Sequence, residues 1–190
     1  MAKKKFSDFQ TFIALTLVCI GAASVLAVVH HLTKKPIKDA ELRQKQEALR
    51  IVLPKETVRI DQKTIIFEGS ETEIHVGKDS KGRLVGYAVE ATTSEGYGGD
   101  VVFLIGLDAE GKIKTYKIMI HKETPGLGDN LTSPEFKKQF IGKNLDNFTF
   151  KVTKDGGDVQ AITAATISSR AACDALKRGL EIFKAFKKGQ

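Results

Sequence analysis

The feature that most constrains this chain is an uncharged apolar stretch near its N-terminus. No Asp, Glu, Lys or Arg interrupts the sequence from Phe9 to Val29. A helix of that length rises roughly 31 Å, which matches the hydrocarbon core of a bilayer. A cleaved signal peptide would have a shorter apolar stretch and a small-residue cleavage site, and residues 25–32 offer no clean one. Buried core helices are rarely so apolar all round, so a transmembrane anchor is favoured.

The charge distribution agrees with an anchor. The formal net charge is +7 over 190 residues, which alone could suggest a nucleic-acid partner. Residues 1–38 hold six lysines against one aspartate, so most of the excess flanks the apolar stretch and no nucleic-acid binding is expected. Three of these lysines precede the stretch, which by the positive-inside rule favours a cytoplasmic N-terminus and an extracytoplasmic domain.

Length limits the chain to one sizeable core beside the anchor. A connector is predicted because the Glu-, Gln-, Arg- and Leu-rich segment from Asp39 to Leu53 favours a helix and stops at Pro54. Cys19 and Cys173 lie in separate predicted helices, so we expect no disulfide. The predicted parts are a cytoplasmic tail (1–8), a transmembrane helix (9–32), a connector helix (33–54) and one domain (55–190).

The first half of that domain has the pattern of an antiparallel meander. Between Ile74 and Ile120, short β-branched and aromatic runs are separated by turn signals at Gly77–Gly82 and Asp108–Gly111, which predicts three or four strands. Residues 101–107 are apolar on both faces and predict a central strand. Apolar residues alternate with less apolar ones over 116–120, which predicts a half-covered strand.

Two helices are expected to pack on this sheet. The stronger runs from Ile167 to Lys187, with apolar residues at helical spacing and lysines crowding its C-terminal end. Those lysines could bind anionic lipid, but the helix dipole explains them more simply. A shorter helix is predicted over Pro134–Phe140, because Ser133 is a good N-cap and proline suits the first helical position. The fold class is therefore α+β, an antiparallel sheet packed with helices after one transmembrane helix.

The start of the last helix concentrates polar groups. Residues 161–170 hold four hydroxyl side chains and Arg170. A helix start offers unpaired backbone N–H groups and a positive dipole end, which together with an arginine suit a phosphate. Alternatively, Thr163, Thr166 and Ser168 merely cap the helix. The residues alone leave both interpretations open.

Two loops are candidates for contacting a flat ligand. Residues 121–130 follow a strand and place Gly126 and Gly128 around Leu127, and residues 94–100 carry the aromatic Tyr97 among glycines. Each can equally be an ordinary turn, since Pro-Gly is a common turn dipeptide and the third glycine of a dinucleotide fingerprint is missing.

We predict no metal site from the four histidines. His30 and His31 adjoin the membrane end of the apolar stretch, where neutral imidazoles need no special function. His75 and His121 lack the paired cysteine or carboxylate spacing of zinc sites.

Taken together, these three segments resemble the flavin-binding domain of the Rnf complex G subunit and of the C subunit of sodium-pumping NADH:quinone oxidoreductases. The family's flavinylation pattern, Asp-x-x-Ser/Thr-Gly-Ala-Thr, aligns with residues 160–166. Thr163, Ala165 and Thr166 fit the pattern, whereas Gln160 replaces its Asp and Ala164 its Gly. The string Glu-Thr-Pro-Gly-Leu-Gly at 123–128 resembles the family loop that packs on the isoalloxazine.

The resemblance implies a covalently held FMN. A flavin transferase moves FMN from FAD to the final threonine, here Thr166, and leaves a phosphoester. No sequence neighbour of Thr166 looks like an activating base, so it is an acceptor and the chain has no catalytic residue of its own. Leu127 is the expected ring contact and Thr124 a polar one. The expected cofactor-binding residues are Glu95, Gly96, Tyr97, Glu123, Thr124, Gly126, Leu127, Gly128, Thr163, Ala165 and Ser169.

The implied function is that of an electron-carrier subunit in an ion-translocating ferredoxin:NAD oxidoreductase of a prokaryotic inner or plasma membrane. Its partners are other subunits of the complex, the flavin transferase and the bilayer. Two alternatives stay open. One is an anchored module that binds a phosphate-bearing ligand noncovalently. The other is an unflavinylated assembly subunit, should Gln160 and Ala164 block the transferase.

Overall fold

The computed structural model describes residues 8–189, which form two units that meet between Gln44 and Lys45. The first unit belongs to α1 (Asp8–Val52), one unbroken helix of 45 residues with Pro36 inside it. Its large apolar side chains from Phe9 to Leu32 are all exposed. Within the described range, α1 is the one helix whose length and composition allow it to cross a membrane.

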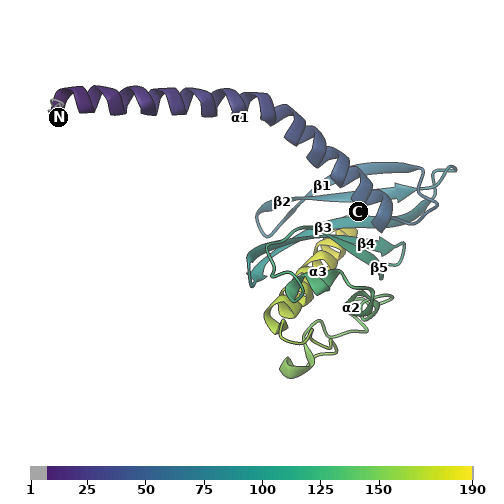
Figure 1. The fold of residues 1–190 in the computed structure, drawn as a ribbon. Helices are drawn as coiled ribbons and strands as arrows, with labels where there is room; N and C mark the ends of the chain where they lie inside the picture. Colours follow the sequence, from purple (N-terminus) through teal and green to yellow (C-terminus); the bar gives the residue numbers. More distant parts are fainter. Residues whose placement is uncertain (1–7, 190) are drawn as a thin grey trace. The chain divides into compact units, whose positions relative to one another are not determined.

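The second unit is built on a five-stranded antiparallel sheet whose strands follow one another in chain order, as Figure 1 shows. Four strands lie largely within Ile74–Ile120 and confirm the predicted meander. The first strand was not predicted, because most of its residues are exposed and it lacks an apolar alternation. The strands are β1 (Arg59–Phe67), β2 (Ser70–Lys78), β3 (Leu84–Gly96), β4 (Gly99–Asp108) and β5 (Ile113–Ile120).

Two of the strand connections have the same construction. In each, an aspartate side chain accepts two backbone N–H groups: Asp79 directly follows β2, and Asp108 is the last residue of β4. A glycine three residues later takes the left-handed conformation, with φ of +77° at Gly82 and +85° at Gly111. These are the positions at which the sequence carried its turn signals, because such φ values favour glycine.

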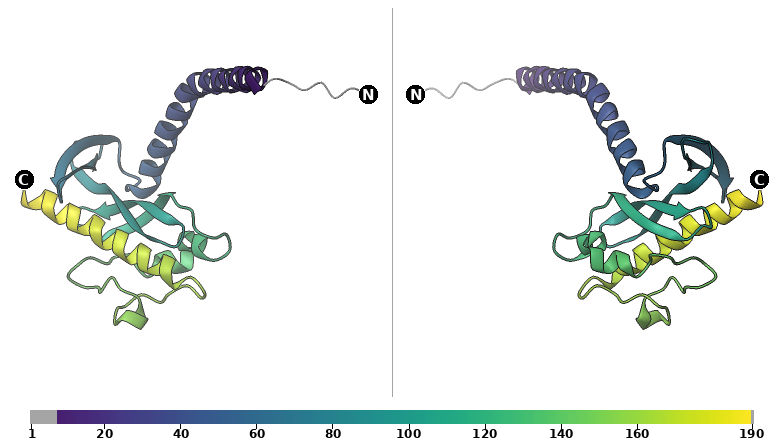
Figure 2. Two further views of the ribbon diagram at one scale, coloured as in Figure 1. Left: turned by 90° about the vertical axis from the view of Figure 1, so that its left-hand side faces the viewer. Right: turned by 90° about the vertical axis from the view of Figure 1, so that its right-hand side faces the viewer.

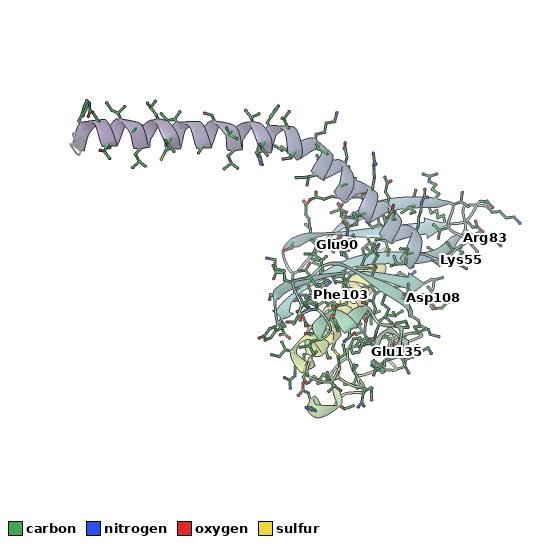
Figure 3. The ribbon with its side chains drawn as sticks, in the orientation of Figure 1. Lys55, Arg83, Glu90, Phe103, Asp108 and Glu135 are labelled. Carbon is green, nitrogen blue, oxygen red and sulfur yellow. The ribbon has the colours of Figure 1, made fainter. Side chains whose placement is uncertain are left out.

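Both faces of the sheet are covered by helices. Phe103, on β4, lies in the large core beneath α3 (Thr166–Lys188), which runs along one face in both views of Figure 2. Leu104, its neighbour, points the other way and packs with Ala48 and Val52 from the end of α1. Figure 3 labels Phe103 on the α3 side and Glu90 on the opposite side. The strand predicted to be apolar on both faces is therefore an interior strand, and the half-covered β5 is an edge.

The predicted helices are confirmed. α3 buries a stripe of small and apolar residues against the sheet, with Leu176 and Gly179 in its middle. α2 (Pro134–Lys138) begins where predicted, since the Ser133 hydroxyl accepts the Phe136 N–H at 3.3 Å. It is shorter than expected because the chain turns after one helical turn and inserts Phe140 into an aromatic cluster. That cluster contains Tyr116, Phe136, Phe140, Phe148 and Phe150.

Candidate functional site

The candidate site begins at the first turn of α3. Thr166 is the first residue of the helix and is half-buried. Its hydroxyl takes part in none of the hydrogen bonds found among residues 8–189. No side chain caps the helix at Ala165, and Ser168 is bonded to another segment. The interpretation of these hydroxyls as caps is therefore wrong, and the Thr166 oxygen is left available.

Ser169 holds the turn that leads into the helix. Its hydroxyl accepts the Ile162 N–H at 2.9 Å and donates to the Ala165 carbonyl at 2.9 Å. Ala164, inside this turn, has a φ of +61°. A left-handed conformation suits glycine and costs an L-residue roughly 1–2 kcal/mol. The turn therefore gives a physical reason for the glycine in the family's flavinylation pattern, which this chain replaces with alanine.

A buried carboxylate ties the helix to both candidate loops. Glu123, after β5, is 6% exposed. One of its oxygens accepts the Gly98 N–H at 3.3 Å, and the other accepts the Ser168 hydroxyl at 2.5 Å. No ion pair to Glu123 occurs within the described part of the chain. Its burial is therefore offset by neutral donors, one from each neighbouring segment.

Glycines allow these segments to approach so closely. A Cβ on Gly128 would lie 2.4 Å from the Glu123 Oε2 and 2.6 Å from the Ser168 Oγ. One on Gly96 would lie 2.8 Å from the Glu123 Oε1, and one on Gly98 only 2.0 Å from the Lys122 carbonyl oxygen. Each glycine therefore supplies space that any other residue would fill.

A pocket of about 500 Å³ lies over this network. Its volume falls within the range of small-molecule and cofactor sites, roughly 300–1,000 Å³. Exposed apolar side chains rim it, since Tyr97 is 70%, Leu127 41% and Ile167 47% exposed. Such a rim suits a flat aromatic ring left partly open to solvent. The pocket is lined by Tyr97, Glu123, Thr124, Leu127, Gly128, Ala164, Ala165, Thr166, Ile167 and Ser168.

Seven of the predicted site residues meet in this lining: Tyr97, Glu123, Thr124, Leu127, Gly128, Ala165 and Thr166. Five others lie outside it, Glu95 among them. Gly96 backs onto Glu123, Gly126 shapes the loop with a φ of +75°, Thr163 is exposed before Ala164, and Ser169 is buried under the turn.

Glu95 and Arg170 belong to another part of the surface. Both line a separate pocket that also contains Asp174. The Arg170 guanidinium donates two hydrogen bonds to Asp155, at 2.6 and 2.8 Å, and these bonds hold the pKa of that carboxyl below its usual range. The prediction that Arg170 adds charge to the Thr166 site is wrong, because Asp155 binds it instead.

Ala164, Ile167 and Ser168 line the pocket but were not predicted as binding residues. Ser168 carried a signal, since it is one of the hydroxyls at the helix start. In the sequence, Ile167 was distinguished only as an apolar residue at the start of the last helix. Among residues 8–189, no group of three or more His, Cys, Asp or Glu side chains is placed to hold a metal ion.

Comparison with known proteins assigns this site to a class. Residues 96–181 match the family model of the FMN-binding domain. This range includes most of the first loop, all of the second and the start of α3. The chain therefore contains an FMN-binding domain. A solved structure of NqrC from Shewanella oneidensis has a TM-score of 0.47 with this chain at 20% identity, covering 65% of each.

Two full-length relatives narrow the class further. The G subunit of the ion-translocating oxidoreductase complex of Methanosarcina acetivorans is 34% identical over 181 residues, covering 92% of this chain and 95% of that one. The G subunit of the proton-translocating ferredoxin:NAD(+) oxidoreductase complex of Clostridium ljungdahlii is 30% identical and matches over the full length of both. The chain belongs to this family of G subunits of ion-translocating oxidoreductase complexes.

Proposed function

We propose that this chain is a membrane-anchored electron carrier that holds FMN through a phosphoester on Thr166. It serves as one relay in an ion-translocating ferredoxin:NAD oxidoreductase, alongside the other subunits of that complex. The observation that carries the proposal is the Thr166 hydroxyl, which lies at the first residue of α3, faces a pocket and is unused by the fold. Its neighbours Ser168 and Ser169 are both committed to internal hydrogen bonds.

Different parts of the pocket would hold the phosphate and the ring of FMN. The free N–H groups at the start of α3 favour the phosphate next to Thr166. The ring would contact the apolar surfaces of Tyr97, Leu127 and Ile167. Glu123 holds the two loops and the start of α3 together through its hydrogen bonds. FMN, when bound, supplies the redox chemistry, and the protein sets its exposure and surroundings.

The composition of the pocket favours covalent over noncovalent retention. Its lining contains Glu123 but no lysine or arginine. Arg170, the nearest candidate by sequence, is bound to Asp155. A noncovalent phosphate ligand would depend on the helix start alone, and would be lost once it dissociated into a large outside volume. A phosphoester removes that dependence on concentration.

The anchoring part of the proposal rests on α1. Residues 9–32 are proposed to cross the membrane once, with 1–8 in the cytoplasm and the domain on the extracytoplasmic side. A Ser94→Cys variant in intact cells tests this orientation, because Ser94 is exposed while Cys173 is buried. Labelling by a membrane-impermeant maleimide before lysis, with Cys19 replaced by serine, supports the proposed side; labelling only after lysis contradicts it.

The proposed attachment is tested by intact mass. The chain is produced together with a flavin transferase, as wild type and as Thr166→Ala. We expect the wild type to gain the mass of FMN minus water and the variant to gain nothing. Thr163→Ala is the matched control, because Thr163 is a nearby threonine outside the pocket lining, and it should be modified like the wild type.

Each other result selects an alternative. Flavin that co-purifies but is released by denaturation indicates the noncovalent module. A wild-type chain without flavin in any form, even when isolated from its own membrane, indicates an unflavinylated assembly subunit. Mass gain that persists in Thr166→Ala and disappears in Thr163→Ala would move the attachment to the other threonine.

A further inference from the structure

A second opening lies between two strands of the sheet. The pairing of β2 with β3 ends at Ile74 opposite Val89. Both strands nevertheless continue, β2 back to Ser70 in its pairing with β1 and β3 on to Gly96 in its pairing with β4. The sheet therefore splits between residues 70–73 and 90–93, and we call this split the sheet notch. Among residues 8–189, no strand pairs with either of the two backbone edges that face the notch.

Two like charges flank the point at which the strands part. Continuing the antiparallel register by one residue would place Glu73 directly opposite Glu90, and like charges in that position destabilise a sheet. Lys45, near the end of α1, lies between them, with its ammonium 2.8 Å from Glu73 and 3.3 Å from Glu90. The lysine spans the notch on one face of the sheet without closing it.

The sheet notch opens into a cavity of about 540 Å³ with two unlike sides. On the α1 side are Glu73 and Glu90, whose negative charge Lys45 only partly balances. On the α3 side lie apolar surfaces of Phe67, Ala91 and Ile182, beside an ion pair between Glu68 and Arg178. The lining as a whole carries four glutamates against two basic residues, although the chain is basic overall.

A buried imidazole next to the notch is also unsatisfied. His75, on β2, is 4% exposed, and its Nε2 has no hydrogen-bond partner within residues 8–189. This nitrogen lies 3.9 Å from the Glu73 carboxylate, on the α1 side of the notch. Buried polar atoms are nearly always paired in folded proteins. His75 does not itself line the cavity, and Glu73, which does, connects it to the notch.

We infer that the sheet notch binds an extended segment of another protein in which basic and aliphatic side chains alternate. The unpaired backbone edges of β2 and β3 can accept an added strand. Alternate side chains of a strand point to opposite faces of a sheet. Basic side chains would therefore reach Glu73 and Glu90, while the aliphatic ones between them would pack on Phe67 and Ile182.

The test uses the full chain in a nonionic detergent and a labelled probe peptide of alternating lysine and valine, six residues long and blocked at both ends. Fluorescence anisotropy measures binding to wild type, to Glu73→Gln/Glu90→Gln and to the control Glu110→Gln/Glu135→Gln. The control removes the same charge from two exposed glutamates elsewhere. Hydrogen exchange of residues 90–93 reports whether the peptide pairs with β3.

We expect saturable binding that weakens at least about tenfold in Glu73→Gln/Glu90→Gln and stays unchanged in the control. Exchange at residues 90–93 should slow in wild type when the peptide is added, a readout that depends on no variant. A glutamate–valine peptide should not bind. Equal weakening in both variants, unprotected amides or absent binding would each overturn the inference. Thr166→Ala should bind as wild type does, so the result is independent of the flavin proposal.

Discussion

The pocket beside Thr166 and the sheet notch have similar volumes, but different interactions form their walls. In the pocket, one buried carboxylate is satisfied by a neutral hydroxyl and a backbone N–H, and glycines bring three segments together. In the notch, two partly exposed glutamates flank the split between β2 and β3, and one lysine pairs with both of them. The pocket should therefore respond to changes in side-chain size, whereas the notch should respond to changes in charge.

Enlarging a glycine beneath the pocket should have the largest effect. Gly128→Ala would place a Cβ against both Glu123 and Ser168, and overpacking of this kind costs about 1–3 kcal/mol. We expect a melting temperature lower by several degrees and little flavin on Thr166. Gly126→Ala is the control, because its site is open and only its left-handed φ opposes the change. Thermal melts and flavin fluorescence in gels compare them; equal losses in both would mean that packing against Glu123 is unimportant.

Removing the buried carboxylate of Glu123 should have the second-largest effect on stability. Glu123→Ala leaves the Ser168 hydroxyl and the Gly98 N–H without a partner, at a cost of about 1–3 kcal/mol. Asp155→Ala removes a carboxylate from the same end of α3, but that one is exposed and paired with Arg170, so its loss should matter less. Urea unfolding of the two variants measures the difference. A larger loss of stability in Asp155→Ala than in Glu123→Ala would contradict the expectation that the buried hydrogen bonds matter more than the exposed ion pair.

The region of the notch should give the chain a pH dependence. Burial lowers the pKa of His75 and the charge of Lys45 lowers it further, against the opposing effect of Glu73 and Glu90. The folded state therefore takes up a proton less readily than the unfolded state, so stability is retained above the ordinary value of 6.5 and lost as pH falls below it.

Melting temperatures between pH 8 and pH 5 test this dependence. His75→Gln cannot titrate, so its curve should be flatter below pH 6.5 than that of the wild type. His121→Gln, at an exposed histidine, should keep the wild-type slope. An unchanged slope in His75→Gln would assign the acid sensitivity to other groups.

The smallest effect is expected in the turn before α3. Ala164→Gly relieves a left-handed alanine but adds freedom to the unfolded chain, so the net gain should be at most about 1 kcal/mol. Unfolding in urea measures it, and flavin loading should be equal to or above that of the wild type. A loss of stability would show that the alanine methyl makes a contact worth more than the strain.

The sequence predicted the features that depend on residues close together in the chain, and it missed features that depend on distant residues. The first helix carries a continuous apolar stretch, and the strands after Ile74 and the last helix carry periodic apolar patterns. Both kinds of pattern are local. β1 lacks such a pattern because most of its side chains are exposed. The role of Arg170 was predicted wrongly because its partner Asp155 lies at the end of a short 3-10 helix that no local pattern connects to α3. The seven residues of the pocket came from family resemblance, since the spacing alone could not bring residues 97, 123–128 and 166 together.

The sheet notch was invisible in the sequence for a related reason. It depends on where the pairing of two strands stops, and Glu73, Glu90 and Lys45 meet at that point only in the folded chain. Each of these is an ordinary surface residue when read alone.

The strand order has a consequence for how the site comes into being during synthesis. Every strand pairs with the one before it in the chain, so each pairing closes only a short loop and the sheet can form as the chain emerges. α3 is the last element and must return across the finished sheet. Thr166 therefore meets Glu123 and its loops only when the polypeptide is almost complete. An arrested or truncated chain that lacks α3 would therefore also lack Thr166, the proposed acceptor for the flavin.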